Sequence, residues 1–167
     1  MEKSRKRVLF LTQAAVIAAV YVVMTVFINA FGLANGAIQI RISEALTILP
    51  VFTPAAIPGL FIGCLIANTI TGAIIWDIIF GSLATLIGAI GTYLLKKYIY
   101  AAVLPPILAN TIVVPLVLKF AYGLPDAVWY LAVTVCAGEI ISCGILGLLL
   151  YTGLKRHKKL LSLDAEM

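Results

Sequence analysis

A few ionisable side chains interrupt the long apolar stretches of this sequence. The carboxyl of Glu139 is the deepest, because it lies roughly 16 Å along a helix that begins at Val128, at about 1.5 Å per residue. A carboxyl group that far into hydrocarbon lacks water and must face a polar partner or a ligand. Its neighbours Gly138 and Gly144 are small enough to permit a cavity or close helix packing. Glu139 is therefore a candidate binding residue, and a structural acid that links helices is the alternative.

Five further side chains could form a polar site. Arg41 and Glu44 stand three residues apart and form either an outer-rim site or a surface ion pair of little energetic value. Asp77 follows Trp76, and such a pair could stack on a planar ring and accept its N–H groups. An acid at a helix start and a tryptophan in the aromatic belt are the structural alternatives. Asn110 could read a heterocycle or link two helices.

Small residues mark one face of the first apolar run. Two pairs of alanines spaced four residues apart predict a flat surface that another helix can approach closely. This surface is either a docking site for a partner or part of the internal packing of the bundle. The alanines are Ala14, Ala15, Ala18 and Ala19.

The elements that position these residues must be membrane helices. Of the 167 residues, 63% are hydrophobic and 11% charged, and the mean hydropathy is +1.13. A soluble domain averages about 45–50% apolar and about 25% charged residues. The composition therefore excludes a soluble enzyme, a disordered chain and a soluble nucleic-acid binder. It predicts an all-α polytopic membrane protein that is surrounded by the lipid bilayer.

The basic residues set the number of helices. Three clusters, at 3–7, 96–97 and 155–159, share one side of the membrane if the positive-inside rule holds. An even number of crossings must then separate the clusters, which requires two crossings within 45–75, divided at Pro54–Pro58. We therefore expect one integral domain over 1–167 in the plasma membrane, with both termini cytoplasmic. Its six transmembrane helices are predicted at 8–30, 45–57, 59–75, 76–95, 100–119 and 127–153.

No residue pattern indicates catalysis, a cofactor or a metal site. Cys64, Cys136 and Cys143 lack the spacing of metal ligands, and His157 is the single histidine. The sequence contains no G-x-x-x-x-G-K-[ST] motif for ATP. Active transport would therefore take its energy from other subunits. An intramembrane enzyme that uses Glu139 as acid or base is the weakest alternative.

Two strings and one dipeptide carry a resemblance to a known family. The segments QIRISEALT at 39–47 and WDIIFGSLAT at 76–85, together with Gly138-Glu139, resemble the QueT family. The resemblance covers essentially the whole chain. It implies a six-helix bundle like those of the substrate-binding (S) components of energy-coupling factor (ECF) transporters. It also implies that the alanine face docks on a transmembrane coupling subunit, which works with two cytoplasmic ATPase subunits.

The same resemblance implies a queuosine precursor, a 7-deazaguanine such as queuine or its aminomethyl analogue, as the ligand. A carboxylate suits the two adjacent N–H donors on the base edge, and an amide suits the carbonyl. A tryptophan suits the flat ring, and an aminomethyl cation calls for a second carboxylate. Two alternatives remain, an S component for another vitamin-like ligand and a stand-alone small-molecule carrier.

Overall fold

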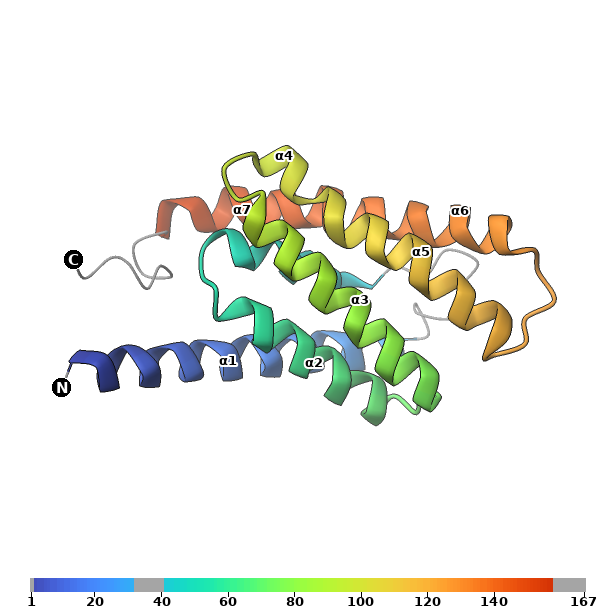
Figure 1. The fold of residues 1–167 in the computed structure, drawn as a ribbon, viewed down its shortest axis with the longest axis horizontal. Helices are drawn as coiled ribbons and strands as arrows, with labels where there is room; N and C mark the ends of the chain where they lie inside the picture. The colour runs from blue at the N-terminus through green and yellow to red at the C-terminus, as the bar shows by residue number, and fades with distance from the viewer. Residues whose placement is uncertain (1, 32–40, 158–167) are drawn as a thin grey trace.

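Apolar runs form helices in a membrane because each backbone polar group must be hydrogen-bonded within the protein. The computed structural model describes residues 2–31 and 41–157, and every regular element in those ranges is helical. Six antiparallel passes form one bundle (Figure 1), which confirms the predicted all-α architecture. The passes comprise α1 (Glu2–Ala30), η1 (Ile42–Val51), α2 (Ala56–Ile70), α3 (Ile75–Leu94), α4 and α5 (Ile99–Ala102 and Leu104–Phe120), and α6 to η3 (Val128–His157).

The second pass is short and differs from the predicted α-helix. The segment η1 is a 3₁₀-helix of 10 residues, and its residues 43–50 are all buried. A turn over 52–55 then leads into α2, so two antiparallel passes lie between 42 and 70. Runs of 3₁₀-helix longer than three or four residues are uncommon, because their hydrogen bonds are poorly aligned. Protein surrounds this one on all sides, which is where such a backbone is tolerated within a membrane.

The last pass is a single rod with an irregular middle. It comprises α6 (Val128–Glu139), the π-helical segment η2 (Ile140–Leu146), α7 (Gly147–Leu154) and the short η3 (Lys155–His157). π-helical turns inside α-helices are rare overall, and those that occur often lie at functional sites. Here it begins directly after Glu139.

Within residues 2–31 and 41–157, four helices are long and apolar enough to cross a membrane by themselves. They cover Lys3–Ala30, Ile75–Leu94, Ile99–Phe120 and Val128–Leu154. The helices η1 and α2 are apolar but shorter. The 15-residue α2 would extend about 22 Å at 1.5 Å per residue, which is less than the hydrocarbon thickness of about 30 Å. The helix η1 is buried inside the bundle, and α2 contributes one buried face to its core.

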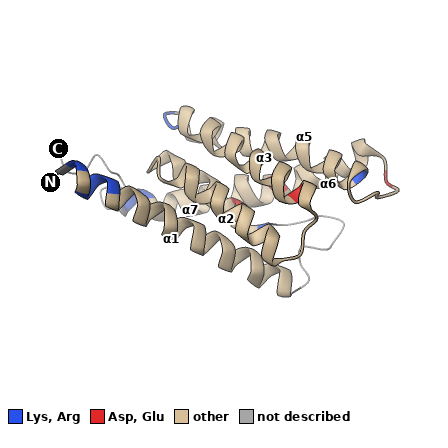
Figure 2. Cartoon of the chain, turned by 60° about the horizontal axis from the view of Figure 1, so that its bottom comes forward, with Lys and Arg blue, Asp and Glu red and all other residues tan. Residues whose placement is uncertain are grey.

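The start of α1 and the end of the last pass lie at one end of the bundle (Figure 1). The turn at 52–55 and the α3–α4 connection lie at the same end, whereas the 71–74 and 121–127 connections lie at the other. Lysine and arginine gather at the end where α1 starts (Figure 2). This arrangement brings the described members of the three basic clusters together, as the parity argument requires. Lys158 and Lys159, like Gln39 and Ile40 of the first string, lie outside the described residues.

The alanines of α1 do not share one outward face. Ala14 and Ala18 are 8% and 7% exposed and pack against α2. A Cβ atom on Gly59 would lie 2.7 Å from the Ala14 carbonyl oxygen, and one on Gly63 would lie 3.1 Å from the Ala18 Cα. This close approach explains the glycines of α2. Ala14 and Ala18 therefore belong to the internal packing of the bundle, and the docking of the four-alanine face on a partner stays a prediction.

Ala15 and Ala19 lie on the exposed side of α1. They retain the small side chains that would let another helix approach. Within α1, Ala15, Ala19 and their exposed neighbours are the part of the alanine face that is open to a partner helix.

Candidate functional site

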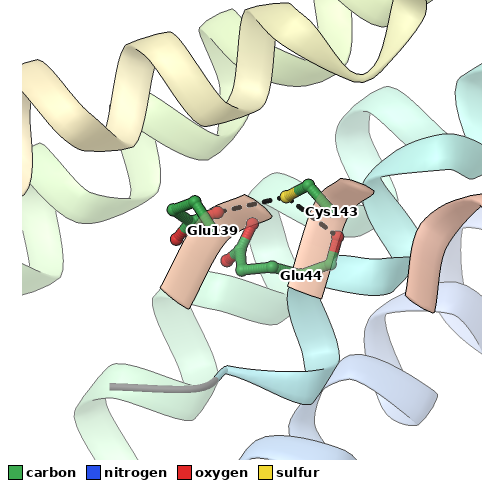
Figure 3. A group of neighbouring side chains, drawn as sticks. All are labelled: Glu44, Glu139 and Cys143. Carbon is green, nitrogen blue, oxygen red and sulfur yellow. Dashed lines mark hydrogen bonds between the residues drawn. The ribbon is translucent and has the colours of Figure 1, made fainter. Parts of the chain in front are cut away.

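Two buried acids from distant parts of the sequence meet in the core of the bundle. Glu44 lies on η1 and Glu139 ends α6, and their exposed fractions are 0% and 5%. Together with Cys143 they form a group in which one donor atom from each side chain lies within 4.8 Å of the others. Figure 3 shows the two carboxylates and the thiol directed toward one another. This group of three thus contains two of the six predicted binding residues and adds a cysteine.

The 3₁₀ geometry of η1 explains how its polar residues reach this group. With three residues per turn, Glu44 and Thr47 lie on the same line of the helix. The Thr47 hydroxyl donates hydrogen bonds to the Glu44 carbonyl oxygen at 2.6 Å and to the Cys143 sulfur at 3.4 Å. An α-helix would rotate these two side chains apart by a further 60° or so over three residues. The tight helix therefore holds η1 against the last pass.

Cys143 bridges the two acids. Its thiol lies 3.1 Å from Glu139 Oε2 and 3.5 Å from the Glu44 carbonyl oxygen, and it can donate to either. Cys143 lies in the π-helical segment, so the irregular turn orients the thiol toward the acids. A thiol is a weak donor and carries no formal charge at neutral pH. It neutralises neither carboxylate.

Three other helices complete the surroundings of Glu44. Tyr21, from α1, donates its hydroxyl to Glu44 Oε1. The amide of Asn110, from α5, faces both carboxylates, and Thr85 of α3 faces Glu44. Among the described residues, Glu44 Oε2 has no hydrogen-bond partner, although it is buried. An unsatisfied buried carboxylate oxygen is costly, and it is a natural position for a ligand donor.

A second polar group lies nearer the end of the bundle opposite the termini. Asp77, the third residue of α3, lies 4.0 Å from the guanidinium of Arg41 and accepts a 3.1 Å hydrogen bond from the Tyr122 hydroxyl. Tyr122 also accepts a hydrogen bond from the backbone N–H of Ile74. These contacts tie the start of η1 and the 121–127 connection to α3. Arg41 and Asp77 therefore form an ion-paired group of their own at the start of α3.

Trp76 is not brought to either polar group. Its side chain is 54% exposed and stacks on Phe80 at a centroid distance of 6.0 Å. It lines an apolar surface groove of about 470 Å³ between α3 and α5, with Val113, Leu116 and Val117 among the other lining residues. Since Trp76 and Asp77 are adjacent in a helix, their side chains diverge by about 100°. In this conformation Trp76 lies where an aromatic belt residue would lie, facing lipid.

Comparison with known proteins assigns the chain to a family. A family model described as "QueT transporter" matches residues 11–156, which is most of the chain and includes both acids. The chain belongs to the QueT transporter family. It is accordingly a membrane protein of a transporter family, as the two sequence strings indicated.

One curated relative extends this result. The "Queuosine precursor transporter QueT" of Lactococcus lactis subsp. cremoris (strain MG1363) is 36% identical over 73 residues. That match covers 44% of this chain and 43% of the relative, so it spans less than half of either protein. No solved structure matches the chain.

The candidate site contains residues that the sequence did not single out. Tyr21, Thr47, Cys143 and Tyr122 were not predicted, although three of them have a sequence signal. Thr47 follows Glu44 by three residues, Cys143 follows Glu139 by four, and Tyr21 is the sole tyrosine in the first apolar run. Helical spacing from each acid would have found the first two.

The acid group also has the composition of a weak metal site. Two carboxylates and a thiol lie close enough to hold one cation. Hard cations prefer oxygen ligands and softer ones prefer thiolate, so this mixed set favours neither class. The geometry therefore suits a positively charged or N–H-rich organic group at least as well as a metal ion.

Proposed function

We propose that this chain is the substrate-binding subunit of an ECF-type transporter and captures a 7-deazaguanine precursor of queuosine. One observation carries the proposal: two carboxylates and an amide converge in the core of a QueT-family protein, and one carboxylate oxygen lacks a partner. A bicyclic base with N–H donors and a carbonyl complements such a set. The similarity to the Lactococcus queuosine precursor transporter supports this ligand class.

The polar groups suggest a route for the ligand. Arg41 and Asp77 lie toward the end of the bundle opposite the basic clusters, and the acid pair lies deeper. If the basic end is cytoplasmic, the ligand enters from outside, past Asp77, and reaches Glu44 and Glu139 in the core. ATP hydrolysis by two partner subunits and docking to a coupling subunit would then release it inside.

Binding and co-purification together test this function. Tritiated queuine and 7-aminomethyl-7-deazaguanine are titrated into the purified chain in detergent, with riboflavin and thiamine as ligands of another class. We expect saturable binding of the deazaguanines and co-purification with a coupling subunit and two ATPases from native membranes. Binding of a different vitamin would assign another ligand. Uptake into liposomes by the purified chain without partners would indicate a stand-alone carrier.

The topology gives a separate prediction. On a background in which the three native cysteines are replaced, Lys97→Cys is expected to react with a membrane-impermeant maleimide only after the cells are opened. Asp126→Cys, in the connection at the other end of the bundle, is the matched control and is expected to react in intact cells. Both positions are exposed, so burial does not limit the reaction. Labelling of position 97 from outside would contradict cytoplasmic termini.

A further inference from the structure

The spacing of the two core acids fits a single nitrogen atom between them. Oxygen atoms of Glu44 and Glu139 lie within 4.8 Å of each other. When one nitrogen donates two hydrogen bonds of about 2.9 Å at a tetrahedral angle, its two acceptors lie about 4.7 Å apart. An ammonium group has three such donors and a full positive charge. The two carboxylates are therefore close enough for one ammonium group to donate to an oxygen of each.

The charges around the pair favour a cationic ligand. Glu44, Asp77 and Glu139 are buried acids, and among the described residues the cation that acts on them is Arg41. Arg41 forms its ion pair with Asp77, at 4.0 Å.

The core pair thus lacks a cation of its own within the described part of the chain, and the side chains that contact it, among them Tyr21, Asn110 and Cys143, are neutral. Two charged carboxylates at this separation repel each other strongly in a medium of low dielectric constant. A ligand cation placed between them would turn that repulsion into attraction.

Glu44 and Glu139 each already accept a hydrogen bond at one carboxylate oxygen. This argues against the N–H edge of the deazaguanine base as their main partner. Paired recognition of two adjacent N–H groups uses both oxygens of one carboxylate. Here Glu44 Oε1 already accepts from Tyr21, and Glu139 Oε2 accepts from Cys143. Each acid therefore offers one oxygen more readily than two, and Glu44 Oε2 is the unpartnered one. One oxygen from each of two acids is the arrangement that a single ammonium group needs.

We propose that Glu44 and Glu139 together bind an amine substituent of the ligand, so that the transporter selects 7-deazaguanines with an aminoalkyl group at C7. This proposal rests on the proposed function and specifies the substrate within it. The base itself is then read by other groups, of which Asn110 is the nearest amide.

A cycle of ligand and protein changes tests the selection. The probes are 7-aminomethyl- and 7-cyano-7-deazaguanine, which share the bicyclic ring and the base edge but differ in the charge at C7. Wild type, Glu44→Gln and Glu139→Gln are titrated with both by equilibrium dialysis. We expect wild type to prefer the aminomethyl compound roughly 30- to 1000-fold, because the cyano compound cannot make the charged hydrogen bonds and leaves the buried carboxylate oxygens without a donor. Either glutamine variant is expected to reduce that preference to less than threefold.

Asp77→Asn is the matched control, because it removes a buried acid that is paired with Arg41 instead. It is expected to change the affinities for both compounds by a similar factor and to keep the preference. Equal binding of the two compounds to wild type, with equal losses in both glutamine variants, would assign the acids to the base edge and overturn the proposal. Binding of neither compound to wild type would reject the proposed function itself. The wild-type comparison decides the question even if a variant fails to fold.

Discussion

We expect Glu139→Gln to bind 7-aminomethyl-7-deazaguanine about 30- to 1000-fold more weakly than wild type. The substitution keeps the shape of the side chain, removes its charge and places an NH₂ group where an acceptor is needed. Loss of a charged hydrogen bond and burial of an unpaired donor together cost about 2–4 kcal/mol. Isothermal titration of the purified proteins in one detergent measures the change directly.

The control for this measurement is Cys136→Ala. Cys136 lies three residues before Glu139 on α6 and packs in an apolar cluster, so its substitution tests for a general disturbance of that helix. We expect the affinity of Cys136→Ala for 7-aminomethyl-7-deazaguanine to remain within threefold of wild type. If Glu139 merely accepts the Cys143 thiol to hold the last pass together, glutamine would change the affinity by less than threefold as well. In that case the binding role would pass to Glu44 and Asp77.

The architecture could be predicted because the membrane leaves few choices. Composition alone required apolar helices, and the basic clusters required an even number of crossings between them. Pro54 and Pro58 then indicated where the stretch 45–75 divides, and the structure places a turn at 52–55. These arguments use rules that act on whole segments, so they do not depend on side-chain packing.

The detailed site could not be predicted, because it depends on the direction in which each helix points its side chains and on which side chains then meet. Glu44 reaches Glu139 because η1 is a 3₁₀-helix, and no residue pattern in 42–51 distinguishes that helix from an α-helix before the packing is known. Trp76 was expected beside the ligand, but its neighbour Asp77 occupies the inward direction. Glu139 itself was predictable because a carboxyl in mid-membrane is costly wherever it points.

The orientation of the α1 alanines could not be predicted from the sequence either. Their positions lead to the second prediction of a large effect. We expect Ala15→Trp and Ala19→Trp to abolish uptake and co-purification with the coupling subunit, because a bulky side chain would separate two closely packed helices. Ligand binding by the isolated chain is expected to remain within threefold of wild type, since both alanines lie on the exposed side of α1, away from Tyr21. Transport into whole cells and affinity pull-down provide the two measurements.

Ala14→Trp and Ala18→Trp serve as the contrasting pair. Their backbones lie against Gly59 and Gly63, so an indole ring at either position would force α1 away from α2. Because Tyr21 of α1 donates to Glu44, this displacement would also remove a contact of the acid pair. We therefore expect these two variants to lose ligand binding and thermal stability together, unlike the outward pair. Normal uptake by both Ala15→Trp and Ala19→Trp would show that the coupling subunit, if there is one, docks elsewhere on the bundle.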